Sequence, residues 1–139
     1  IPEKAVLSGT TRTFDPEIWA NYPKILEPVI KGVCDAMGAS YEFKFTQGYP
    51  PLENDPDMVA RVKESMVKVV GADQIKEPES TMGAEDFSFV FQKAKGCYFW
   101  IGSGFEGCAP LHNSKFDFDE SVMLLGVETL VRLALDMMG

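Results

Sequence analysis

The chain has 139 residues, of which 45% are hydrophobic, 24% charged and 12% aromatic. This length suits one domain with a packed core, and the composition excludes wholesale disorder. The formal net charge is −8, from 21 acidic and 13 basic residues, and the sequence has no run of Lys or Arg. Because phosphate binding needs clustered cations, we expect no nucleic-acid partner.

The cysteines and the apolar stretches indicate where in the cell the protein is located. Cys34, Cys97 and Cys108 are an odd number in a sequence without an apparent secretory signal, which favours a reducing, cytoplasmic location. No apolar stretch approaches the roughly 20 residues of a membrane helix, so we expect no membrane span. The chain starts at Ile1 without an initiator Met or a signal-peptide pattern, which suggests a piece of something longer.

The first half of the chain predicts a strand, a helix and a second strand. Residues 5–14 are rich in Thr and apolar side chains, and residues 41–45 alternate between aromatic and polar. Between them, an N-cap and a proline at 15–16 open a helix that Gly38 closes. Pro23 and Pro28 each remove a hydrogen bond from it, so we expect a kink, or a short helix followed by a longer one.

The second half follows a boundary at 48–55, where two prolines are adjacent. The continuous apolar run 97–101 is typical of a strand buried on both faces. The last helix is apolar on nearly every side and should lie in a core. The predicted elements are a helix at 58–70, a loop at 72–83, a short helix at 84–93, a strand at 97–101, a Gly-rich loop at 102–113 and a helix at 120–138.

Both halves look incomplete, because a single buried strand needs partners at both edges and the first half has only two strands. The fold class predicted from these elements is mixed α/β (α+β), in a chain that is truncated.

His112 is the only histidine in the sequence. A lone histidine in a loop is usually structural or solvated, although His is also a common metal ligand. Cys108 lies four residues earlier, a spacing compatible with shared metal binding. A catalytic zinc site typically needs about three protein ligands and a water, and nothing else nearby supplies a third ligand.

Two further sites have a plain and a functional interpretation. Glu85 and Asp86 suit the first turn of a helix, where acidic side chains complement the dipole. In the functional alternative, Gly83 lets a ligand approach the backbone, and free N–H groups at the helix start bind a substrate carboxylate. Arg12 is either solvated or a bidentate partner of a carboxylate. Asp119 and its acidic neighbours should cap the last helix.

Three motifs together carry a resemblance to a known family. They are Ile1-Pro2-Glu3-Lys4-Ala5 through Gly9-Thr10-Thr11-Arg12-Thr13-Phe14, then Met82-Gly83-Ala84-Glu85-Asp86-Phe87, then Pro110-Leu111-His112-Asn113-Ser114-Lys115-Phe116-Asp117-Phe118-Asp119. In this order and at these intervals the chain resembles the metallo-aminoacylase and carboxypeptidase superfamily. The branch is that of hippurate hydrolase, N-acyl-amino-acid amidohydrolases and the plant auxin-conjugate hydrolases.

The resemblance implies a two-domain metallohydrolase of which this chain is the C-terminal part. Residues 1–52 would be the second half of a two-layer α/β lid, or dimerisation, domain. Residues 53–139 would contain the last helices and strand of the α/β catalytic domain. The intact enzyme would be a homodimer through the lid.

The resemblance also implies a site for a small N-acyl amino acid and two divalent metal ions, which could be zinc, manganese, cobalt or nickel. His112 would be a metal ligand, and Arg12, Met82, Gly83 and Glu85 would lie on the substrate side. The other ligands and the general-base Glu of the family have no counterpart in this sequence. We therefore assign no catalytic residue here, and we expect the fragment alone to bind no metal and to be inactive. The alternative is a non-catalytic dimerisation module derived from such an enzyme.

Overall fold

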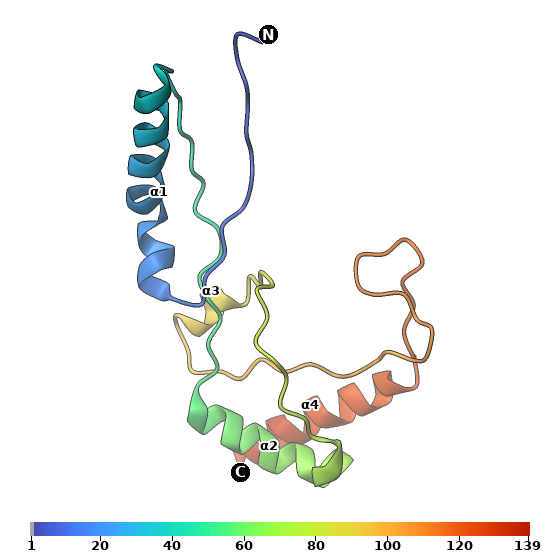
Figure 1. The fold of residues 1–139 in the computed structure, drawn as a ribbon. Coiled ribbons are helices and arrows are strands. Elements are labelled where there is room, and N and C mark those ends of the chain that lie inside the picture. The colour runs from blue at the N-terminus through green and yellow to red at the C-terminus, as the bar shows by residue number, and fades with distance from the viewer. Residues whose placement is uncertain (1) are drawn as a thin grey trace. The chain divides into compact units, whose positions relative to one another are not determined.

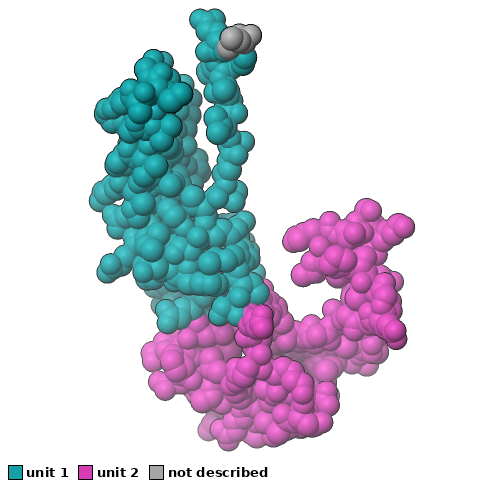
Figure 2. Space-filling model, viewed as in Figure 1, with its two compact units in different colours: residues 1–53, 80–94 teal, residues 54–79, 95–139 magenta. Residues whose placement is uncertain are grey.

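The computed structural model describes residues 2–139, which form helices joined by long extended segments (Figure 1). Two compact units share the chain: unit 1 comprises residues 1–53 and 80–94, and unit 2 comprises residues 54–79 and 95–139 (Figure 2). The elements in chain order are α1 (Pro16–Met37), α2 (Pro56–Val70), the 3-10 helix η1 (Ala72–Gln74), α3 (Ser88–Phe91) and α4 (Val122–Met138).

The predicted mixed α/β fold is wrong for the described residues, because they form helices but no β-sheet. The predicted strands at 5–14, 41–45 and 97–101 are extended segments without ladder partners, and the β-pairing found in the described part is an isolated bridge between Ala109 and Phe116. A strand needs a neighbouring strand that donates and accepts backbone hydrogen bonds along its whole edge. Helices lie against two of these segments, 41–45 and 97–101, whereas residues 5–14 are largely exposed.

Helix α1 has the termini that its sequence predicts. The Asp15 carboxylate accepts hydrogen bonds from the N–H groups of Glu17 and Ile18 at 2.7 and 3.0 Å. At the other end Gly38 adopts φ 64, a left-handed conformation that costs glycine little. The helix is continuous through both internal prolines, so of the two predicted alternatives the short helix followed by a longer one is wrong.

A side chain from the neighbouring extended segment compensates for Pro23. Proline has no N–H group to donate to the carbonyl of Trp19, four residues earlier. Gln47 fills this role, because its Nε2 donates to the Trp19 carbonyl oxygen at 3.1 Å. In return, Trp19 Nε1 donates to the carbonyl of Gly48 at 3.3 Å. The extended segment thus replaces the missing helix donor and fixes its own position along α1.

In unit 1, one face of α1 packs against the 41–47 segment. Tyr22 is 8% exposed and its ring centroid lies 5.9 Å from that of Phe45, which in turn contacts Phe43. The aromatic alternation of this segment therefore has a physical use although no sheet forms. Tyr22 belongs to an apolar stripe of α1 whose other members remain exposed: Ile18, Ile25, Val29, Val33 and Met37.

In unit 2, α2 and α4 pack against each other. Val62 and Leu133 are buried at 4% and 7% exposure, together with the small polar Ser65 and Thr129. Both helices agree with the prediction, although α2 begins two residues earlier and α4 two residues later than predicted. The prediction that α4 would be buried nearly all round is wrong, because much of its apolar surface is exposed, including Leu124, Val127, Val131, Leu135 and Met138.

An ion pair joins α2 to α4 near the C-terminus, and another lies within α4. Lys68 Nζ lies 2.9 Å from Asp136 Oδ2, and Arg132 Nε lies 3.1 Å from the same carboxylate. Hydrogen bonds from Lys68, and also from Ser65 and Arg132, lower the pKa of Asp136 to about 2.

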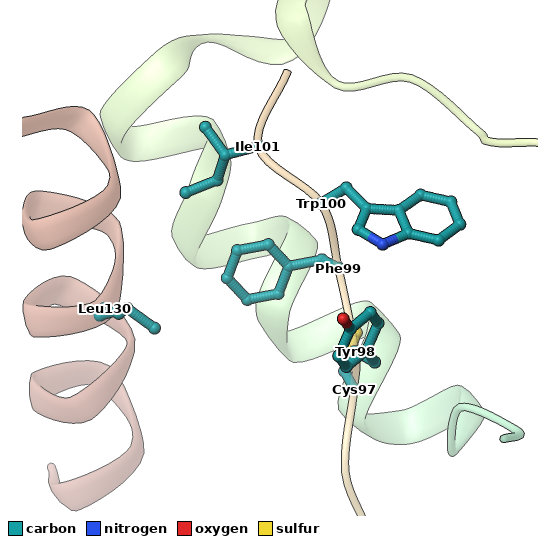
Figure 3. Close-up of a pocket in the computed structure, with 6 residues that line it drawn as sticks. All are labelled: Cys97, Tyr98, Phe99, Trp100, Ile101 and Leu130. Atoms are coloured by element: carbon teal, nitrogen blue, oxygen red, sulfur yellow. The ribbon is translucent and has the colours of Figure 1, made fainter. Parts of the chain in front are cut away.

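The extended segment 97–101 lies beside these helices (Figure 3). A Cβ atom on Gly126 of α4 would lie 3.0 Å from Ile101 Cδ1, so glycine permits this close approach. Trp100 points away from the helices and is 55% exposed, so the predicted burial on both faces is wrong. Within the described residues, no helix is both long and apolar enough to cross a membrane.

Candidate functional site

His112 lies at an exposed turn of unit 2 that is closed by local hydrogen bonds. The Asn113 N–H donates to the Pro110 carbonyl at 3.2 Å, and the Phe116 N–H donates to the Asn113 carbonyl at 3.0 Å. The bridge between Ala109 and Phe116 joins the two ends of the turn. The imidazole is therefore carried on a short closed loop and faces solvent.

The backbone of His112 is unusual, since it has φ 65 and is the one non-glycine residue with positive φ in the described chain. Histidine is more tolerant of this region than most residues, yet the conformation still costs free energy. A backbone outlier of this kind is a reason to suspect a functional position.

The segment after His112 is tied to the start of α4. The Asp119 N–H donates to the Ser103 carbonyl at 2.8 Å, and its carboxylate accepts from the Ser121 N–H at 2.9 Å. These bonds to Ser121 lower the pKa of Asp119. The prediction that Asp119 caps the last helix is wrong, because the N-cap of α4 is Ser121 and no side chain among the described residues bonds to the free N–H groups of the helix.

The described residues do not form a metal site by themselves. No group of three His, Cys, Asp or Glu among residues 2–139 is placed to hold a metal ion. A catalytic metal typically needs about three protein ligands. His112 could supply one ligand, and the rest of any metal centre would have to come from outside these residues.

The segment with Met82, Gly83 and Glu85 lies in unit 1 and leads into α3. Glu85 Oε1 accepts a hydrogen bond from the Phe87 N–H at 3.1 Å, but Glu85 precedes α3 and does not lie in its first turn, where the plain interpretation placed it. The Phe87 N–H is therefore not free to bind a substrate carboxylate. Helix α3 has only four residues, fewer than the predicted 84–93 helix, so it carries little dipole.

The surroundings of Gly83 and Met82 are open. The Gly83 N–H donates to Thr81 Oγ1 at 3.3 Å, and a Cβ atom on Gly83 would lie 3.2 Å from that hydroxyl. Met82 is 49% exposed. The close backbone approach proposed for Gly83 is therefore used by Thr81 in this structure.

Arg12 is exposed on the extended N-terminal segment of unit 1. The four candidate substrate residues (Arg12, Met82, Gly83 and Glu85) thus belong to unit 1, whereas His112 belongs to unit 2. Sequence order alone had placed residues 82–85 in the same part as His112.

Two features of the structure were not predicted as candidate sites. A groove of about 380 Å³ is lined by residues 97–101 and Leu130, and it contains none of the predicted site residues (Figure 3). In unit 1, the Ser88 hydroxyl is buried without a hydrogen-bond partner. The sequence signals an apolar segment at 97–101, but nothing in it marks Ser88.

Comparison with known proteins explains the three motifs. Residues 2–136, nearly the whole chain, match the peptidase family M20/M25/M40. The chain belongs to this family. The resemblance inferred from the motifs is thereby confirmed.

Several curated relatives carry names of hydrolases. The chain is 36% identical over 138 residues to "Putative amidohydrolase YhaA" of Bacillus subtilis, covering 97% of this chain and 35% of that protein. It is 35% identical to thermostable carboxypeptidase 1 of Saccharolobus solfataricus, covering 91% and 32%. It is 29% identical to the N-acetyldiaminopimelate deacetylase of Pediococcus pentosaceus, covering 95% and 34%.

The chain spans about a third of the length of these relatives. No solved structure matches it.

Proposed function

We propose that this chain is part of a metal-dependent amidohydrolase that cleaves the amide bond of N-acyl amino acids. We call the protein of the relatives' length that contains it the full-length protein. The observation that carries the proposal is the family match over residues 2–136. Because the chain spans about a third of its relatives, the activity is proposed for the full-length protein.

The names of the relatives support the substrate class. A carboxypeptidase and an N-acetyldiaminopimelate deacetylase are both named for hydrolysis of an amide bond to an amino acid. In both reactions the substrate has a carboxylate close to the scissile amide. N-acyl amino acids, such as hippurate-type conjugates, are small substrates with the same two groups.

Specific residues would contribute in two ways. His112 would supply one ligand to a centre of two divalent metal ions (zinc, manganese, cobalt or nickel). Its exposed turn supports this, because the imidazole is accessible to groups outside the described residues. Arg12 would bind the substrate carboxylate in bidentate fashion, and Met82, Gly83 and Glu85 would line the substrate side.

A matched pair of substrates tests the proposal. The full-length protein should hydrolyse N-benzoylglycine, and it should hydrolyse the methyl ester of this compound, at the amide bond, much less efficiently because the carboxylate is lost. Failure to hydrolyse a panel of N-acyl amino acids and dipeptides would contradict the proposed function.

Arg12→Gln addresses the binding residue separately from the activity. It should raise KM for N-benzoylglycine by about 10-fold or more, the effect of losing a charge-assisted bond. It should leave the low activity toward the methyl ester unchanged. Lys44→Gln, an exposed charge in the same unit, is the control. Equal changes of KM in both variants would contradict the role of Arg12 in binding the substrate.

The exposed stripe of α1 favours a second role for unit 1, the binding of a second copy of the protein. Val29 and Val33 are 64% and 61% exposed, and neighbouring apolar residues extend this surface. Contiguous exposed apolar surface commonly marks an interface. In light scattering, Val29→Glu should convert dimers to monomers, whereas Lys24→Glu on the polar side of α1 should not. A wild-type monomer would contradict this.

We also propose a reducing, cytoplasmic compartment, supported by the free thiols of Cys34, Cys97 and Cys108. Thiol titration of protein isolated under non-reducing conditions should find these three thiols unpaired. A disulfide between any two of them would contradict the assignment.

A further inference from the structure

The chain passes between the two units at three points, after residues 53, 79 and 94. Immediately beyond the first and the last of these points, residues 54–55 and 95–98 lie side by side within unit 2. The Asp55 N–H donates to the Gly96 carbonyl at 3.0 Å. These two crossings therefore begin from one place in unit 2, although they are far apart in sequence.

Asn54 makes the closest link between the two segments. Its Nδ2 donates to the Tyr98 carbonyl at 2.9 Å, and its Oδ1 accepts from the Tyr98 N–H at 2.7 Å. A carboxamide offers the same donor and acceptor as a peptide group. Asn54 therefore binds both backbone groups of Tyr98, as a residue of a neighbouring strand would.

An ion pair adds to this link. Lys95 Nζ lies 3.0 Å from Asp55 Oδ2 and 3.6 Å from Asp57 Oδ2. Lys95 is 70% exposed, so solvent weakens the pair. The two Asn54 bonds are part-buried and should be the stronger component. We call residues 54–55 together with 95–98 the brace.

The brace shortens the loop that must close when unit 1 assembles. In unit 1 the Tyr49 and Phe89 rings meet at 5.8 Å in an edge-to-face contact, which joins residues 80–94 to residues 1–53. The two rings are about 40 residues apart in sequence but only about five or six residues from the brace, and loop-closure entropy increases with loop length. A closed brace therefore favours the contact between the rings.

We propose that Asn54 is a positioning residue that holds the 80–94 segment in unit 1. This segment contains Met82, Gly83 and Glu85, so the brace would also fix these candidate substrate residues. The inference does not rest on the proposed activity, because it concerns a contact between two rings and can fail independently of it.

NMR of the 139-residue chain tests this through the nuclear Overhauser effect between the Tyr49 and Phe89 rings. In Asn54→Ala the ratio of docked to undocked segment should fall by up to about tenfold, because the loop that the ring contact closes lengthens from about 11 to about 40 residues when the brace opens. Asn54→Asp keeps the shape and the acceptor but removes the donor, and should cause a smaller loss in the same direction. Contacts between α2 and α4 should be unchanged in both variants.

Asn21→Ala is the control, because Asn21 Nδ2 also donates to a carbonyl, that of Glu17 at 2.8 Å, but lies outside the brace. It should leave the ring contact intact. An undiminished Tyr49–Phe89 effect in Asn54→Ala would overturn the proposal. Equal loss of the ring contact and of the α2–α4 contacts would also overturn it, because Asn54 would then support unit 2 as a whole.

Discussion

Units 1 and 2 each contain a long helix, but they cover it differently. In unit 2, α4 packs against another helix, and Val62 and Leu133 are buried between them. In unit 1, Tyr22 is the buried apolar side chain of α1, and an extended segment covers it. A covering helix satisfies its own backbone hydrogen bonds, whereas an extended segment depends on other groups for them. We therefore expect unit 2 to unfold at a higher denaturant concentration than unit 1.

The largest expected effect is at the centre of the α2–α4 contact. Leu133→Ala should lower the free energy of unfolding of unit 2 by about 2–4 kcal/mol, because it leaves a cavity in a buried position. Urea unfolding followed by far-ultraviolet circular dichroism measures this.

Leu135→Ala is the matched control on the same helix, because Leu135 is 57% exposed. Its cost should be within about 0.5 kcal/mol. Equal costs at the two positions would mean that α4 is not buried on one face as described.

In unit 1, the N-cap of α1 should have the next largest effect. Asp15→Ala removes the acceptor of two N–H groups and should destabilise α1 by about 1 kcal/mol. Asp15→Asn keeps a capping side chain and should be nearly neutral. Hydrogen exchange at the Glu17 and Ile18 amides reports the change locally, and equal exchange in both variants would contradict the cap.

The ion pairs of unit 2 predict a pH dependence. The folded pKa of Asp136 is about 2, below the ordinary value of 3.8 for an aspartate side chain. The carboxylate therefore stabilises the fold above about pH 3.8, and this contribution is lost as the pH falls towards 2. Asp136→Asn should remove this part of the acid dependence of urea unfolding, whereas Glu128→Gln on the same helix should not. Identical pH profiles of urea unfolding for the wild type and Asp136→Asn would contradict this contribution of Asp136.

The smallest effect concerns Gln47 and Pro23. Gln47→Glu keeps the side-chain length but removes the donor to the Trp19 carbonyl, and should cost up to about 1 kcal/mol. In a Pro23→Ala background the helix supplies its own donor, so the same change should cost almost nothing. The double-mutant cycle measures the difference. Additive costs would mean that Gln47 does not compensate for the proline.

The sequence predicted the helices because their signals are local. Asp15, Gly38 and Gly71 mark helix ends with side chains or conformations that act within a few residues. The local sequence around Pro23 does not predict a continuous helix, because the donor that replaces its missing N–H group comes from Gln47, far along the chain. The prediction of strands was wrong for a related reason. A segment becomes a strand only when another strand pairs with it, and the local sequence pattern does not specify that partner.

The candidate site was only partly predictable. The motifs identified the family, because three of them recur in order along nearly the whole chain. They did not reveal that residues 80–94 join unit 1 while His112 belongs to unit 2. Asn54 also escaped notice, because an asparagine before an aspartate N-cap has no local signature of a bond to Tyr98.

The central claim is that His112 is a metal ligand of an amidohydrolase, and the metal content of the full-length His112→Asn variant tests it most directly. Asparagine tolerates positive φ, so the turn should keep its conformation while the imidazole is lost. Elemental analysis should find about one metal ion fewer per chain, and turnover of N-benzoylglycine should fall by at least about 100-fold. Unchanged metal content and turnover would contradict the account.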